Sequence, residues 1–213
     1  MRKLISVRTV LLALCLLSAC STPSIDEQPA QEFAAEGLHP VKGTGFDTAY
    51  VLPEADLPSY STVNFEAFRS ADAEVTQTTM TGTNRRDWQM TAERQENLAN
   101  AWSNATDHAF RNYPLEDSGA KSLLVKAELT RVSPGRSGAT SSVAAGSASS
   151  AMREVVNVSA ELRLFDESSG QLLAVVRDRQ TIGSLQWTRA AGVDTANLFN
   201  SWAALLHTRV SGR

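Results

Sequence analysis

The sequence has almost no cysteine. Two occur among its 213 residues, Cys15 and Cys20, and both lie within the first 20 positions. This excludes a disulfide within the remaining chain, and equally a thiol nucleophile or a thiolate metal site there. The protein must be stabilised by a packed core, which a chain of this length can bury.

Histidine and catalytic motifs are scarce as well. The three histidines, His39, His108 and His207, have no metal-ligand spacing. A Gly-x-Ser-x-Gly elbow, a phosphate-binding loop with its lysine and a dinucleotide fingerprint are all missing. The sequence therefore predicts no catalytic residue, no cofactor and no metal.

Positive charge is not in excess, and long apolar runs are missing. The formal net charge is −3, whereas nucleic-acid binding needs concentrated lysine and arginine, so no nucleic-acid partner is expected. The longest apolar run near the N-terminus covers residues 10–17, well short of the roughly 20 residues that span a membrane.

What is present at the N-terminus is the pattern of a secretory signal. Arg2, Lys3 and Arg8 precede the short apolar run, and the small residues Ser18 and Ala19 follow it. This order predicts a signal peptide over residues 1–19, cleaved between Ala19 and Cys20.

The cleavage point, Leu17-Ser18-Ala19-Cys20, resembles the lipobox of bacterial lipoproteins. The resemblance implies that Cys20 carries diacylglycerol, becomes the first residue of the mature chain and anchors it to a membrane. Each buried CH₂ of an acyl chain contributes about 0.8 kcal/mol to membrane binding, so anchoring by three acyl chains would be effectively permanent. The next residue is Ser21 rather than aspartate, which by the same resemblance implies the outer membrane, with the domain facing the periplasm.

A proline-rich stretch follows the lipobox. Five of the seven prolines lie between residues 23 and 58, in a polar and acidic context without periodicity. This composition predicts a lipidated N-terminal linker over residues 20–58, acting as a spacer or a tether, and a single periplasmic domain over residues 59–213.

The remaining chain alternates strand and helix patterns. Residues 166–170 read as a hairpin loop with glycine in the left-handed position. Amphipathic stripes predict helices over about 91–112, capped by Thr91, and over 195–209, capped by Asp194 or Thr195. Period-two alternation predicts strands over residues 62–68, 122–132, 155–165 and 171–180.

The predicted order is β-α-β-β-β-α. We therefore expect an α+β fold, with a mostly antiparallel sheet of about four strands and two amphipathic helices packed on one face. The order around the first helix resembles small α+β domains of other envelope lipoproteins, including activators of peptidoglycan synthases. That resemblance concerns the fold and carries no function.

A closer resemblance covers most of the mature chain. Four stretches together resemble an uncharacterised family of proteobacterial lipoproteins with a domain of unknown function. They are Gly45-Phe46, Tyr60-Ser61-Thr62-Val63, residues 164–174 and Asn200-Ser201-Trp202-Ala203. The family has no known catalytic residues, so the resemblance implies no site.

Charged residues end the last predicted strand, where Arg177, Asp178 and Arg179 follow one another. Period two puts Asp178 on the apolar face, where it needs a partner such as Arg131 or Arg153. Arg177 and Arg179 would form an anion or polar-ligand site, or would be solvated arginines beside a structural ion pair.

A second candidate interface follows that strand. Trp187 lies close to Arg189, and tryptophan and arginine are enriched at binding anchors. Trp88 and Trp187 lie near element ends, where exposure is expected, whereas Trp102 and Trp202 fall in the helix stripes and should be core. The small residues of 143–152 would form a flexible crossover loop or a close-packing surface.

Three functions stay open. The favoured one is a non-enzymatic outer-membrane lipoprotein whose periplasmic domain binds an envelope protein or the cell wall. The alternatives are a carboxylate-dependent hydrolase, which needs two acids converging in a pocket, and a carrier for a small apolar or lipid ligand, which needs an unfilled cavity.

The lipobox interpretation predicts that Cys20→Ala abolishes palmitate labelling and leaves an unprocessed or wrongly cleaved chain. Cys15→Ala is the matched control, because it removes a cysteine that lies within the predicted signal peptide. Metabolic labelling with palmitate checks both variants. Normal labelling of Cys20→Ala would contradict lipidation at this residue.

Overall fold

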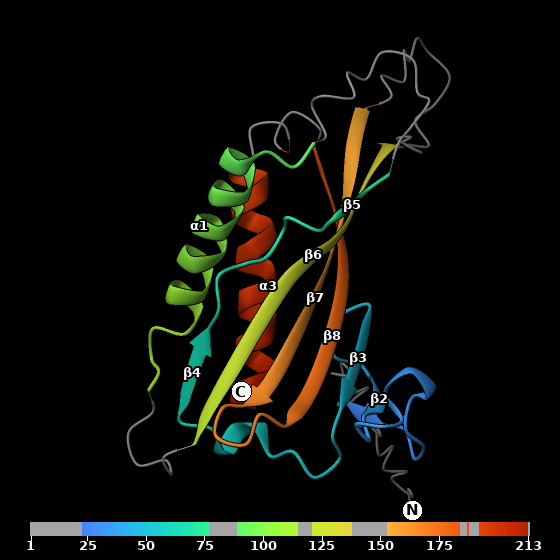
Figure 1. Ribbon diagram of the computed structural model, residues 1–213, viewed down its shortest axis with the longest axis vertical. Coiled ribbons are helices and arrows are strands. Elements are labelled where there is room, and N and C mark those ends of the chain that lie inside the picture. The colour runs from blue at the N-terminus through green and yellow to red at the C-terminus, as the bar shows by residue number, and fades with distance from the viewer. Residues whose placement is uncertain are drawn as a thin grey trace, which may run out of the picture.

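The structure, a computed structural model, describes residues 23–76, 89–114, 121–137, 153–183, 187 and 192–212. It has two layers, a sheet and a pair of helices, α1 (Ala92–Ala109) and α3 (Val193–Ser211), which both cover one face of the sheet (Figure 1). The expected α+β class is confirmed. Among the described residues, no helix is long and apolar enough to cross a bilayer.

The described sheet has eight strands rather than the expected four or so. Its order is β1-β2-β3-β8-β7-β6-β4, and β5 also pairs with β6. Pairing is antiparallel except that β4 and β5 run parallel to β6, so that α1 lies in the crossover between β4 and β6. The strands are β1 (Ser24–Ile25), β2 (His39–Lys42), β3 (Thr48–Val51), β4 (Thr62–Phe65), β5 (Glu74–Val75), β6 (Ser122–Ser137), β7 (Arg153–Asp166) and β8 (Leu172–Gly183).

The segment predicted as a linker is structured from residue 23 onward. It holds β1, β2 and β3 and two short 3-10 helices, η1 (Gln31–Phe33) and η2 (Leu57–Ser59). Leu38 is completely buried and packs with Phe33 against Val175 of β8, on the face of the sheet opposite the helices. The linker interpretation is therefore wrong for these residues, because their apolar side chains cover the outer face of β8.

The main core lies between the sheet and the helices. Trp102 of α1 and Trp202 of α3 are each 1% exposed, which confirms both as core residues. Phe199 joins the two helices, with ring centroids 5.9 Å from Trp102 and 5.7 Å from Trp202. On the sheet, the buried apolar residues follow the predicted alternation: Leu123, Val125, Ala127 and Leu129 of β6, Val156, Val158, Ala160, Leu162 and Leu164 of β7, and Ala174 and Val176 of β8.

The two helix starts differ. Thr91 caps α1 as expected, since its Oγ1 accepts a hydrogen bond from the Arg94 N–H at 3.2 Å. The cap predicted for α3 is wrong, because that helix begins two residues earlier and its N-cap is Gly192, which has no side chain to accept a bond. Thr195 is instead inside the first turn and 1% exposed.

The predicted hairpin loop is confirmed. Gly170 has φ of 72°, in the left-handed region that glycine adopts without strain. The Asp166 carboxylate accepts hydrogen bonds from Ser168, Ser169 and the Tyr60 hydroxyl, and these lower the pKa of Asp166. Burial, together with the bond to Asp166, raises the pKa of Tyr60 to about 12. The loop is thus tied to the chain just before β4.

If the N-terminal segment is part of the fold, Leu38→Ala should destabilise the protein by about 2–5 kcal/mol, as aliphatic-to-alanine changes in cores do. Ile25→Ala is the matched control in the same segment, because Ile25 is 48% exposed and should change stability by less than about 0.5 kcal/mol. Urea unfolding of both variants measures the difference. Equal and small losses of unfolding free energy in the two variants would support the linker interpretation instead.

Candidate functional site

Arg177 is held by two carboxylates on the outer face of the sheet. Its Nε lies 2.5 Å from Glu161 Oε2 and its Nη1 lies 2.8 Å from Glu32 Oε2. Glu161 is 4% exposed and also accepts a bond from Arg163 at 2.6 Å. Hydrogen bonds from Tyr50 and Arg177 hold the pKa of Glu32 below its usual range. Arg177 therefore joins the N-terminal segment to the sheet. The anion or polar-ligand site that would combine Arg177 with Arg179 stays a prediction.

Asp178 points toward the helices, as its period predicts, and is 5% exposed. Its partners are not arginines. Oδ2 accepts from the Trp202 indole Nε1 at 2.7 Å and from the Gln180 amide at 2.8 Å, and Oδ1 accepts from the Asp47 main-chain N–H at 3.1 Å. Three neutral donors thus satisfy a buried carboxylate without a counter-charge.

Arg131, one of the two arginines expected to pair with Asp178, has other partners. Arg131 pairs instead with Glu74 at 3.5 Å and bonds Thr76 at 3.1 Å. The side chain of Arg153 lies outside the described residues. The predicted partnership fails for Arg131 because that side chain lies beside β5, at the other side of the sheet.

The sheet opens beside Asp178. Strand β3 pairs with β8 from Val51–Ala174 to Thr48–Arg177 and no further. The chain before β3 turns toward α3, where Gly45 has φ of 87° and a Cβ would lie 3.0 Å from Leu205. Because the Asp47 N–H bonds the Asp178 side chain, that stretch leaves the sheet, and β8 continues to Gly183 without a described neighbour on this side.

Main-chain groups of β8 face this opening. The Leu52 N–H bonds the Leu173 carbonyl at 2.8 Å, so odd-numbered residues of β8 point their N–H and C=O toward β3, while even-numbered ones point toward β7. The N–H and C=O groups of Arg179 and Thr181 are therefore directed to the open side. The Gly183 N–H, which points the same way, reaches the Asp194 carboxylate at 3.4 Å.

A groove lies beside these groups. It has a volume of about 280 Å³ and is lined from β8 by Gln180, Thr181, Ile182 and Gly183, and from α3 by Asp194, Asn197, Leu198 and Ser201. We call the open side of β8 from Arg179 to Gly183, with this groove, the β8 edge. Arg179, one of the predicted interface residues, is exposed there.

A second surface lies between the helices. A groove of about 520 Å³ separates the C-terminal halves of α1 and α3, and His108, Arg111 and His207 line it. It continues toward the helix starts as a groove of about 300 Å³, which Asn97, Asn100 and Asn104 line. This surface was not predicted from the sequence, although asparagines at spacings of three and four mark one face of α1.

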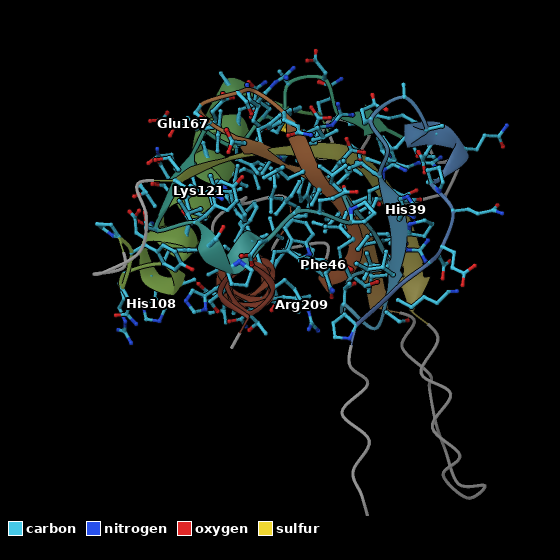
Figure 2. All side chains as sticks on the ribbon, turned by 90° about the horizontal axis from the view of Figure 1, so that it is seen from below. His39, Phe46, His108, Lys121, Glu167 and Arg209 are labelled. Atoms are coloured by element: carbon cyan, nitrogen blue, oxygen red, sulfur yellow. The ribbon has the colours of Figure 1, made fainter. Side chains whose placement is uncertain are left out.

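The helix groove brings His108 and His207 to one place, which their sequence separation did not suggest. The His207 ring packs edge-on against Phe110, with centroids 5.1 Å apart. Figure 2 shows His108 on the opposite side of the molecule from His39. In the described residues, no group of three histidine, cysteine, aspartate or glutamate side chains could hold a metal ion.

Trp187 is not an exposed anchor. Its side chain is fully buried, and the Arg94 guanidinium lies 5.6 Å from its ring. The expectation fails because the ring of Trp187 is part of the main core, beside Arg94 of α1. Cys20, Trp88, Arg189 and the small-residue segment 143–152 lie outside the described residues.

Comparisons with known proteins show little similarity. No family model and no curated protein matches the chain. Among solved structures, it is similar to the PelC dodecamer from Paraburkholderia phytofirmans, at 13% identity and a TM-score of 0.30, over 75% of this chain and 93% of that one. A single-residue variant of that dodecamer matches at 13% identity and a TM-score of 0.31, over 75% of this chain and 97% of that one. At these TM-scores the similarity carries no argument about fold or function.

The contribution of the Asp178–Trp202 hydrogen bond to stability can be measured by comparing the same substitution at Trp202 and at Trp102. Trp202→Phe removes the indole N–H that Asp178 accepts, whereas the Trp102 Nε1 has no partner in the described residues. Both changes lose the same ring volume, so Trp202→Phe should cost about 1–3 kcal/mol more than Trp102→Phe. Equal losses in urea unfolding would show that the bond does not stabilise Asp178.

Proposed function

We propose that this chain is a lipid-anchored protein of the bacterial outer membrane whose periplasmic domain binds another envelope protein without catalysing a reaction. The partner contributes an extended segment that pairs with the β8 edge. The observation that supports this is the set of outward main-chain groups of Arg179 and Thr181, which have no neighbouring strand among the described residues.

An open strand edge of this kind recruits extended peptides. Unpaired N–H and C=O groups are a template for another strand, and added strands gain affinity from main-chain hydrogen bonds. On the β8 edge, the added segment takes the place that β3 would occupy if its pairing continued past Thr48. The two residues Arg179 and Thr181 then offer four main-chain groups to it.

Side chains around the β8 edge differ on its two faces. On the helix side, the groove presents Asp194, Asn197 and Ser201. On the outer face stands Arg179, whose side chain is exposed. A segment that alternates a hydrogen-bond donor toward α3 with an acidic residue toward Arg179 matches this pattern, because successive strand residues face opposite sides.

The test introduces proline at the centre of the edge. Thr181→Pro removes one outward N–H and places a ring where the partner strand would approach, while the ladder with β7 is kept because residue 181 does not donate to it. A photoreactive phenylalanine at position 179 should crosslink the partner in cells, and Thr181→Pro should abolish the crosslink while leaving the domain folded.

Thr181→Val is the matched control, since it keeps the main chain and removes the hydroxyl that donates to Asn157. It should crosslink as the unchanged protein does. An undiminished crosslink in a folded Thr181→Pro protein contradicts pairing at the β8 edge. A partner captured from position 104 in the helix groove, and not from position 179, would move the binding surface to the helices.

A further inference from the structure

We infer that phospholipid headgroups of the membrane cover the sheet edge formed by β1 and β2, so that the domain lies against the membrane instead of hanging on a long tether. We call this surface, Ser24–Ile25 with His39–Lys42, the anchor edge. The inference rests on the proposed lipid anchoring at Cys20.

The length of chain between anchor and fold sets the distance. Three residues, Ser21 to Pro23, separate Cys20 from Ser24. Ser24 and Ile25 already pair with Lys42 and Val41 of β2. Four Cα steps reach at most about 14 Å, whereas a flexible linker of some 25 residues would span roughly 25–30 Å on average.

Hydrogen bonds and an ion pair hold the anchor edge on the rest of the fold. Residues from Ser24 onward therefore add nothing to the length of free chain between Cys20 and the domain. The Asp26 N–H bonds the Pro40 carbonyl at 2.9 Å, and the Asp26 carboxylate pairs with Lys42 at 2.8 Å. The His39 Nδ1 lies 2.8 Å from the Asp26 carbonyl oxygen. Three contacts thus hold the chain immediately after β1 on β2.

Surface chemistry at the anchor edge fits a membrane boundary. Ile25 is one of two large apolar side chains that are exposed in the described residues, at 48%. It lies five positions after Cys20 in the sequence. An apolar side chain this close to an acyl anchor lies where its burial among headgroups adds to membrane binding.

The opposite edge of the sheet is far from the anchor. Strands β1 and β4 are the two ends of the strand order, and six spacings of about 4.8 Å put them roughly 29 Å apart. Figure 2 agrees, since His39 of β2 and His108 of α1 lie on opposite sides. With the anchor edge on the headgroups, the β4 and α1 side is directed away from the membrane.

This orientation bears on the proposed partner. The β8 edge opens to the side of β8 on which β3, β2 and β1 lie, and three strand spacings amount to about 14 Å. A segment bound there is close to the headgroups. The partner is therefore a membrane-attached protein rather than one reached across a wide gap.

Single-cysteine labelling tests the orientation, because Cys20 is the only cysteine after the signal peptide and lipidation blocks it. Ile25→Cys at the anchor edge and Ala67→Cys, an exposed position just beyond β4, each take one fluorophore. The full lipidated protein is placed in vesicles of phosphatidylethanolamine and phosphatidylglycerol that carry an energy acceptor on some headgroups. Energy transfer should be several-fold stronger from position 25 than from position 67.

Equal transfer from the two positions, or weak transfer from both in vesicle-bound protein, overturns the inference. Insertion of 25 glycine and serine residues between Ser21 and Thr22 should reduce transfer from position 25 to the level of position 67. Cys20→Ala protein labelled at position 25 should not bind the vesicles. If that variant binds as well as the lipidated protein, the proposed anchoring itself fails, which is a different outcome from loss of the positional difference.

Discussion

The buried carboxylate of Asp178 determines where the β3–β8 ladder ends. Burying a charge is costly unless it is hydrogen-bonded, and here the indole of Trp202, the amide of Gln180 and the N–H of Asp47 supply the bonds. One of these donors is a core residue of α3 and another is the main chain just before β3. The same carboxylate therefore holds α3 onto the sheet and turns the N-terminal chain away from β8.

Two surfaces of different character follow from that turn. From Leu172 to Arg177, the N-terminal segment covers β8. Leu38 packs against Val175, and Glu32 binds Arg177. From Arg179 to Gly183, β8 has no neighbouring strand on the β3 side among the described residues, and the main-chain groups of Arg179 and Thr181 are directed outward. The proposed lipid anchor, which three residues separate from β1, would place this open side near a membrane, where it could bind a segment of a neighbouring membrane protein.

Long, regular elements could be predicted from the sequence. Apolar residues alternate along β6, β7 and β8 and form a stripe on α1, and both patterns are long enough to give a clear period. The cap of α1 and the glycine at 170 mark a helix start and a hairpin. The strands β1, β2 and β3 have two to four residues each, too few for a period to be read, and prolines around them suggested a linker. Their folding depends on the outer face of β8, which local sequence does not describe.

The candidate site was predictable only in part. Arg179 was identified because charged residues end an apolar strand. One partner of Arg177 is Glu32 and one partner of Asp178 is Asp47, and both lie far away in the sequence. Trp187 was expected to be exposed from its position after a strand, yet it is buried against Arg94 of α1. An open edge is a property of the strand order, and that order follows from pairing between distant segments.

Amide hydrogen exchange along β8 tests the open edge most directly. In the isolated domain, the N–H groups of Asp178 and Gln180 should be protected because they face β7, while those of Arg179 and Thr181 should exchange as rapidly as exposed loops. Slow and fast amides should therefore alternate along this part of β8. Uniform protection from 178 to 181 would mean that another strand already occupies the edge, and would contradict this expectation.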